Sequence, residues 1–175
     1  MEIKKYYIIL IASFLLSNTL DEYIVSFYGL PMASVKISSI DTLYNKIPAT
    51  KLIFKTETNN FASKFFKIDN MYQTIIDNSN FNILAFEKTT YQPNVTNKLY
   101  TINSSLGPKY YNTNFLIPKN CFNIFSLLYY LSTTPFEKIN TSVKLEREGL
   151  IYNCIITKNK INDLLEFELE FISTN

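Results

Sequence analysis

Residues 165–171 read Leu-Glu-Phe-Glu-Leu-Glu-Phe, and this stretch decides the fold class. In an extended chain its leucine and phenylalanine side chains lie on one face and its glutamates on the other. Such alternation is typical of a half-buried antiparallel strand with its polar face in water. The pattern therefore predicts a mainly β protein in which this strand covers the core.

The same period of two recurs toward the N-terminus. Residues 35–38 alternate apolar and polar side chains, and residues 51–57 place two apolar side chains opposite two lysines. Residues that favour turns separate the segments, as in 77–80 and 148–149. Many short strands at near-regular spacing favour a sandwich or a barrel. We expect further strands at 22–28, 71–77, 81–90, 96–103, 109–116, 142–147 and 150–158.

One segment breaks this β pattern. Asn120 has the side chain of a helix N-cap, and apolar residues then recur at helical spacing until Pro135 ends the pattern. We expect one buried helix over about 120–131, packed against a curved antiparallel sheet or an open half barrel. A shorter helical turn is expected within 59–66. The apolar residues at helical spacing are Ile124, Leu127, Leu128 and Leu131.

The N-terminus has the order of a secretory signal peptide. Lys4 and Lys5 precede an apolar run over 6–16, and the small or polar residues 17–19 follow. The run is too short for a bilayer, which needs roughly 20 apolar residues, so a retained anchor is the weaker alternative. We therefore expect a signal peptide at 1–19, a single β-rich domain at 20–175, and no transmembrane segment after cleavage. Export would place the protein in the periplasm or outer cell envelope of a Gram-negative-type bacterium.

Composition argues against several classes of function. The net charge is only +2 and Arg147 is the one arginine, so the chain lacks the basic footprint of a nucleic-acid-binding protein. Its three glycines are isolated, which excludes glycine-rich phosphate loops. It has no histidine, which removes Ser-His-Asp and Cys-His catalysis and the commonest transition-metal ligand. We expect no cofactor.

Acidic residues offer the remaining options for catalysis or metal binding. Asp69 and Asp77 lie at opposite ends of one expected strand, which at roughly 3.3 Å per residue keeps them too far apart for paired acid–base chemistry. Turn and cap roles suit them better. The row Glu166, Glu168 and Glu170 contains oxygen ligands of the kind that calcium prefers, but a solvated strand face is the favoured interpretation. We expect no catalytic and no metal site, and a protein that is not an enzyme.

Cys121 and Cys154 are the only cysteines. In an oxidising compartment after export, the two cysteines could form a disulfide or stay as free thiols. A disulfide would link the expected helix start to a strand. Two buried free thiols are somewhat favoured, because cysteine packs as a small hydrophobic residue.

Aromatic side chains are abundant, with 13 tyrosines and 14 phenylalanines. Core packing accounts for most of them. A sharper hypothesis is an apolar ligand groove between the helix and the curved sheet, with a few polar groups. The residues that we expect to line this groove are Phe61, Phe65, Phe66, Phe122, Phe125 and Tyr129.

Three motifs occur in order along the chain. Residues 23–35 have the form of a strand, a Gly-Leu-Pro-Met-Ala turn and a second strand. Residues 61–77 place Ser63, Lys67 and Asp69 in a longer signature, and 125–131 read Phe-Ser-Leu-Leu-Tyr-Tyr-Leu. Together they resemble the exported bacterial family called domain of unknown function 3108, over roughly residues 22–157.

The resemblance implies an open, strongly curved antiparallel sheet with a helix on its concave side, a plan similar to that of the periplasmic lipoprotein carriers. Ser132 stands where the family motif has arginine. The family has no established activity to carry over. We therefore expect a non-catalytic envelope protein that binds a lipid, a lipoprotein acyl chain or an apolar partner segment. The alternative is an envelope scaffold or protein-interaction module that uses an exposed strand edge instead of a cavity.

Overall fold

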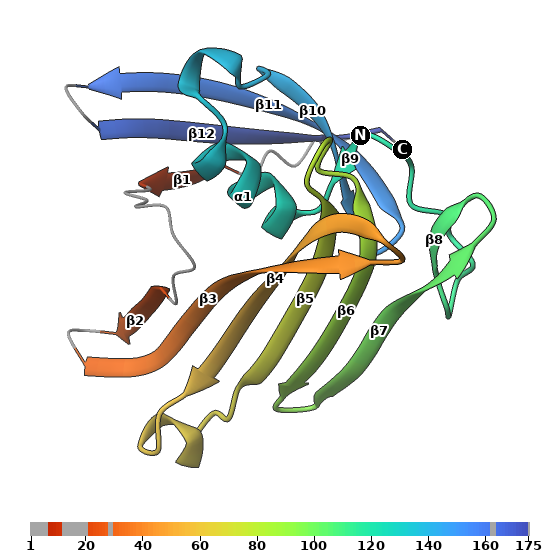
Figure 1. Ribbon diagram of the computed structural model, residues 1–175. Helices are drawn as coiled ribbons and strands as arrows, with labels where there is room; N and C mark the ends of the chain where they lie inside the picture. Colours follow the sequence, from red (N-terminus) through yellow and green to blue (C-terminus); the bar gives the residue numbers. More distant parts are fainter. Residues whose placement is uncertain (1–6, 12–20, 28–29, 162–163, 175) are drawn as a thin grey trace.

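A computed structural model describes residues 7–11, 21–27, 30–161 and 164–174. It contains two β-sheets with one helix between them (Figure 1). The expectation of a mainly β protein with a curved sheet and one helix is confirmed. The strands of the described residues do not close into a barrel.

The larger sheet is a meander of seven antiparallel strands. Each inner strand pairs with the strands that precede and follow it in the chain, so the sheet order is also the sequence order. Inward-pointing side chains alternate with solvated ones as the sequence pattern predicts; on the third strand of the meander, Leu52 and Phe54 are buried. The strands are β2 (Asp21–Phe27), β3 (Leu30–Tyr44), β4 (Ile47–Thr58), β5 (Asp69–Asp77), β6 (Ile83–Gln92), β7 (Val95–Ser104) and β8 (Gly107–Tyr110).

The smaller sheet contains the segment 165–171. Phe167 and Leu169 are buried, while Leu165 and Phe171 are partly buried and pack against the same core, so the alternating pattern correctly predicts a strand that covers the core. The strand order is β1-β12-β11-β10-β9, with only the β9–β10 pair parallel. These strands are β1 (Tyr7–Ile11), β9 (Cys121–Phe122), β10 (Ser142–Arg147), β11 (Leu150–Ile161) and β12 (Leu164–Ser173).

Most of the predicted leader lies outside the described residues. Residues 1–6 and 12–20, with the predicted cleavage point near Thr19 or Leu20, are not described. The intervening strand β1 pairs antiparallel with β12, from Tyr7 opposite Glu170 to Ile11 opposite Glu166. Within the described part of the chain, no helix is long and apolar enough to cross a bilayer.

The hairpin between β10 and β11 is a two-residue turn. Glu148 and Gly149 both have positive φ, at 53° and 94°. This geometry gives a twist that matches the flanking strands, and glycine adopts it without steric cost. The turn brings the end of β10 next to β6 and β8 of the larger sheet, where it contributes to the site described below.

The helix α1 spans Ile124–Thr133 and begins four residues later than the sequence predicts. Asn120 is not its N-cap, because residues 121–122 pair with β10 as strand β9. Asn123 caps the helix instead. Its side chain accepts from the Ser126 N–H at 2.9 Å, while the Ser126 hydroxyl accepts from the Asn123 N–H at 2.9 Å. This reciprocal pair is a capping box. Short 3₁₀ turns occur at Ala62–Lys64, within the expected 59–66, and at Phe136–Lys138.

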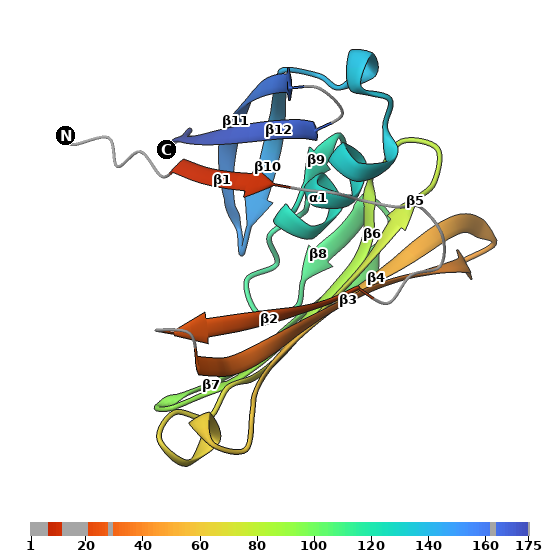
Figure 2. The same ribbon diagram turned by 90° about the vertical axis from the view of Figure 1, so that its left-hand side faces the viewer.

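Packing of α1 against both sheets forms the core. Leu127 is fully buried among the side chains of the smaller sheet, including Leu145 and Ile156. On the other side of α1, Phe125 packs against the larger sheet, with its ring centroid 4.4 Å from that of Phe54 and 4.8 Å from that of Tyr72. Figure 2 shows the helix between the two sheets. The helix therefore serves as the common layer that holds the sheets together.

Candidate functional site

A cavity of about 640 Å³ lies where the first turn of α1, the larger sheet and the end of β10 meet. Its volume falls within the usual range of about 300–1,000 Å³ for sites that bind small molecules. Each of the three structural layers contributes side chains. The lining residues are Tyr72, Phe86, Lys88, Tyr110, Asn123, Ile124, Phe125, Leu145, Glu146, Arg147, Glu148, Tyr152 and Phe171.

One wall of the cavity is aromatic. Tyr72 and Phe86 point inward from adjacent strands of the larger sheet, and Phe125 reaches them from the helix. The Phe86 and Tyr110 rings meet edge to face, with centroids 6.1 Å apart. Because these rings pack against one another as well as against the cavity, they hold its apolar wall in a fixed shape.

A buried carboxyl group lies beyond the Tyr110 ring and forms the polar end of the cavity. Glu146 is 2% exposed. The Tyr110 hydroxyl donates to its Oε2 at 2.9 Å, and the Gly149 N–H donates to its Oε1 at 2.8 Å. Burial raises the pKa of Glu146 above its ordinary value, and the two hydrogen bonds only partly oppose this effect. Burial also raises the pKa of Tyr110, with the nearby charge of Glu146 adding to the shift.

An ion pair lies beside this carboxyl group. Lys88 from β6 places its Nζ 2.7 Å from Oε1 of Glu148 in the β10–β11 turn. The Lys88 side chain is only 14% exposed, so solvent screens this pair less than an ordinary surface pair. Arg147 lines the same end. The cavity is thus amphipathic, with an aromatic wall and a polar, charged end.

A pH dependence follows from the raised pKa of Glu146. The folded protein binds the proton on the Glu146 carboxyl more tightly than the unfolded chain does. The resulting contribution to the free energy of unfolding is complete below pH 4.5, the ordinary pKa of this group, and is lost as the pH rises through the raised pKa. Glu146→Gln has no such titration, and its amide still accepts from Gly149 and donates to Tyr110. We expect the variant to gain stability relative to the natural protein as pH rises. Urea unfolding of both proteins from about pH 4 to about pH 9 measures this difference. Parallel stability curves across that range would contradict it.

Of the six aromatic residues predicted to line a groove, Phe125 lines this cavity. Phe122 and Tyr129 instead pack around Phe81, each with ring centroids 6.4 Å from it. The remaining three do not lie near the helix. Phe61, Phe65 and Phe66 are exposed at the tip of the β4–β5 hairpin, at the far end of the larger sheet.

The cysteines are both buried as free thiols, so the disulfide alternative is wrong for this structure. Strand β10 lies between them, because Cys121 pairs with Lys144 and Cys154 pairs with Val143. Two inter-strand spacings put their backbones about 10 Å apart, which exceeds the reach of a disulfide. Burial raises the pKa of each thiol to about 12, which keeps both protonated and unreactive.

The acidic residues singled out in the sequence lie away from the cavity. Asp77 has a turn role, since its Oδ1 accepts from the N–H of Ser79 at 2.8 Å and from its hydroxyl at 2.6 Å. Asp69 pairs in register with Glu57 at the other end of β5. The glutamates of β12 pair with residues of β1 and β11. Among the described residues, no group of three or more acidic or cysteine side chains gathers in a way that would hold a metal ion.

The polar end of the cavity was not predicted from the sequence. Glu146 meets Tyr110 across 36 residues of chain, and no local pattern indicates such a contact. Its position just before the Glu148–Gly149 turn was the one available signal, since an acid there is well placed to accept from the turn's backbone.

Comparison of the chain with protein-family models, with curated proteins and with solved structures gives no match. The likeness to domain of unknown function 3108 therefore stays a prediction that rests on the motifs themselves. The chemistry of the cavity is therefore the basis for the function proposed below.

Proposed function

We propose that this protein binds an amphipathic ligand, with an apolar body and a polar head, in the cavity between α1 and the two sheets. One observation carries the proposal. The cavity of about 640 Å³ has aromatic side chains along one wall, and its lining also includes the buried Glu146, the partly buried Lys88 and the exposed Arg147. Such a division suits a lipid-like molecule better than a fully polar metabolite or a pure hydrocarbon.

The apolar wall would supply most of the affinity. Each methylene group that a ligand buries contributes about 0.8 kcal/mol, so micromolar binding, which needs about 8 kcal/mol, requires an acyl chain of about ten carbons or more along Phe86 and Phe125. The polar end would fix the orientation, because a buried head group has to find hydrogen-bond partners there. Together, the two ends favour a defined direction of entry for the ligand.

Binding without chemical change fits the state of the polar groups. Both oxygens of Glu146 already accept hydrogen bonds, from Tyr110 and from Gly149. Lys88 is held by Glu148. A general base or nucleophile needs to reach a substrate atom directly, and these groups are instead engaged with one another. We therefore propose a carrier or a sensor rather than an enzyme.

The predicted signal peptide at residues 1–19 suggests where in the cell the protein would meet its ligand. If residues 1–19 direct export, the cavity would meet lipids and acylated proteins of the cell envelope, in the periplasm or at the outer membrane. A lipid or a lipoprotein acyl chain is then the class of ligand that we propose. Fractionation of cells that express the full chain tests this part by itself, because cytoplasmic retention with an intact N-terminus would refute export.

Filling the cavity provides the test of binding. We expect Ile124→Trp, at the first turn of α1, to lower the affinity for an apolar naphthylamine dye by about tenfold or more, because the indole occupies the ligand volume. Native mass spectrometry of the protein purified from a periplasm should show an extra mass that organic extraction removes. Ile124→Trp should lack this mass.

Ile155→Trp is the matched control. It introduces the same side chain at a position on β11 that is exposed and does not line the cavity. Equal loss of dye binding in both variants, or a natural protein that binds no dye and carries no extra mass, would refute the proposed function.

A further inference from the structure

The tip of the β4–β5 hairpin, residues 59–68, exposes three phenylalanine rings. Phe61 is 58% exposed, Phe65 is 77% exposed and Phe66 is 51% exposed. The tip projects away from the helix and the smaller sheet (Figure 1). Isolated exposed apolar residues are ordinary on a soluble protein, but three large rings within one turn form a patch that calls for a partner.

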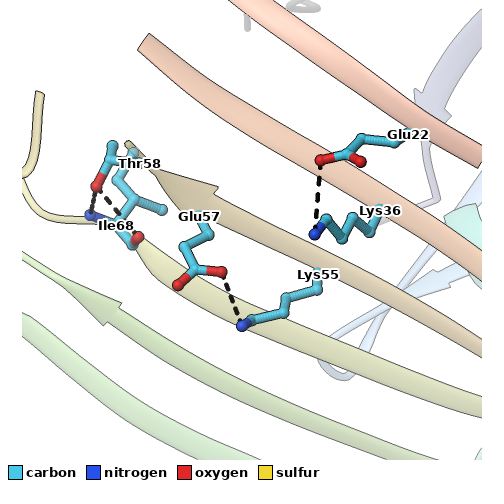
Figure 3. Close-up of polar contacts among 6 residues, drawn as sticks. All are labelled: Glu22, Lys36, Lys55, Glu57, Thr58 and Ile68. Atoms are coloured by element: carbon cyan, nitrogen blue, oxygen red, sulfur yellow. Dashed lines mark hydrogen bonds and ion pairs between the residues drawn. The ribbon is translucent and has the colours of Figure 1, made fainter. Parts of the chain in front are cut away.

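Hydrogen bonds fix the conformation of this tip. At its base, the Thr58 N–H donates to the Ile68 carbonyl at 3.0 Å. The Ile68 N–H in turn donates to Oγ1 of Thr58 at 3.0 Å (Figure 3). Within the tip, the side chain of Asn59 donates to the Pro31 carbonyl on β3 and accepts from the Ala62 N–H. Because Ala62 is the residue that turns inward and is buried, the phenylalanines on either side of it are directed outward.

The backbone of the turn is already internally bonded. The N–H groups of Phe65 and Phe66 both donate to the Ala62 carbonyl, at 3.0 and 2.8 Å, and the Ser63 N–H donates to the Asn59 carbonyl at 2.9 Å. A segment that enters the apolar part of a membrane cannot rely on water for its backbone groups, so internal bonding is what such a segment requires.

Neighbouring hairpins extend the apolar surface at this end of the larger sheet. In a meander, every second turn falls at the same end, so the β2–β3 and β6–β7 hairpins turn beside the β4–β5 tip, as Figure 2 shows. Leu30, Tyr91 and Val95 next to those turns are also exposed. The apolar patch is thus a rim along one end of the sheet, with the β4–β5 tip at its centre.

Positive charge accompanies the rings. The tip carries Lys64 and Lys67 and no acidic residue. Neither lysine has an ion-pair partner among the described residues, and the Lys67 Nζ lies 5.2 Å from the centre of the Tyr91 ring. Two acidic residues flank the tip: Glu57, which is held by Lys55 at 2.8 Å (Figure 3), and Asp69, which lies opposite Glu57 in the register of β4 and β5. Lysine stems can extend along an apolar surface while their ammonium groups reach lipid phosphates.

We propose that this tip docks the protein on an anionic phospholipid bilayer, with the phenylalanines in the acyl boundary and the two lysines at the phosphates. A convex tip with projecting rings and a self-bonded backbone fits a deformable bilayer better than a protein, which would have to offer a matching pocket. The inference concerns a different surface from the ligand cavity, and each stands without the other.

Sedimentation with phospholipid vesicles tests the proposal. We expect the protein to bind vesicles of mixed phosphatidylglycerol and phosphatidylcholine more tightly than vesicles of phosphatidylcholine alone. The double variant Phe65→Ser with Phe66→Ser should lower the partition coefficient by about tenfold for each ring lost. Lys64→Glu with Lys67→Glu should remove the preference for the anionic vesicles. Added salt should weaken the binding of the natural protein.

The matched control is Leu43→Ser with Leu106→Ser. These leucines are 72% and 73% exposed and lie near turns at the opposite end of the same sheet, so their loss should leave vesicle binding unchanged. Unaltered thermal unfolding of the phenylalanine variant, together with unaltered dye binding in its cavity, separates docking from folding and from the proposed function. An absence of vesicle binding, or an equal loss in both pairs of variants, would overturn the proposal and leave a protein as the partner of the tip.

Discussion

Leu127→Ala should lower the free energy of unfolding by about 3 kcal/mol. Leu127 is 0% exposed and lies in the core cluster that α1 shares with the smaller sheet. Removing its branched end takes apolar atoms out of a close-packed site and leaves a void that rigid β-strands on the far side cannot fill. Urea unfolding followed by circular dichroism measures the loss.

Two further variants keep this prediction testable. Leu127→Met conserves volume and should cost less than about 1.5 kcal/mol, which distinguishes a packing defect from general intolerance at the position. Leu106→Ala removes the same atoms from a leucine that is 73% exposed and should change stability by no more than about 0.5 kcal/mol. If the three variants were equally stable, α1 would not form the core described above.

Asn123→Ala should cost about 2 kcal/mol, because this side chain has two roles. Its Oδ1 caps α1 by accepting from the Ser126 N–H, and its Nδ2 donates to Oγ1 of Thr74 on β5 at 3.0 Å. Alanine ends the capping box and leaves the buried Thr74 hydroxyl without that partner. Thermal or urea unfolding gives the size of the effect.

A double-mutant cycle separates the two roles of Asn123. Thr74→Val removes the hydroxyl that the amide contacts while retaining the shape of the side chain. Asn123→Ala should then cost less in the valine background than in the natural protein, by about 0.5 kcal/mol or more. If the two costs were equal, the contact with Thr74 would contribute nothing, and capping would account for the whole effect.

Local sequence patterns were sufficient to predict a mainly β fold with a curved sheet and one helix, but not its division into two sheets. The alternation at 165–171 indicated both the strand and its buried face, because a period of two leaves no other way to bury four apolar side chains together. The start of α1 was not predictable in the same way. Asn120 and Asn123 are equally good caps by residue type, and only the pairing of residues 121–122 with β10, which is a tertiary contact, selects the second.

The site was harder to predict than the fold. The aromatic content indicated an apolar cavity, but phenylalanine occurs in three different environments. Phe125 lines the cavity, Phe122 packs in the core and Phe65 is exposed at the tip of the β4–β5 hairpin. Sequence alone does not distinguish these locations, because they depend on which way a hairpin is directed once it leaves the sheet. The polar end of the cavity depends on contacts between distant segments, as the bond between Tyr110 and Glu146 illustrates.

The division into two sheets also has a mechanical consequence. Among the described residues, no hydrogen bond between two backbone groups joins one sheet to the other. Apart from apolar packing around α1, polar contacts that involve side chains connect the larger sheet and its β5–β6 turn to the smaller sheet, to the segment before it and to the start of α1. Four of them are Tyr110–Glu146, Lys88–Glu148, Thr74–Asn123 and the bond from the Asn120 N–H to the Asn82 side chain. Separating the two sheets would therefore break packing and side-chain contacts while the backbone ladder of each sheet stayed intact. A ligand that enters between the two sheets would therefore require a smaller free-energy change than local unfolding of either sheet.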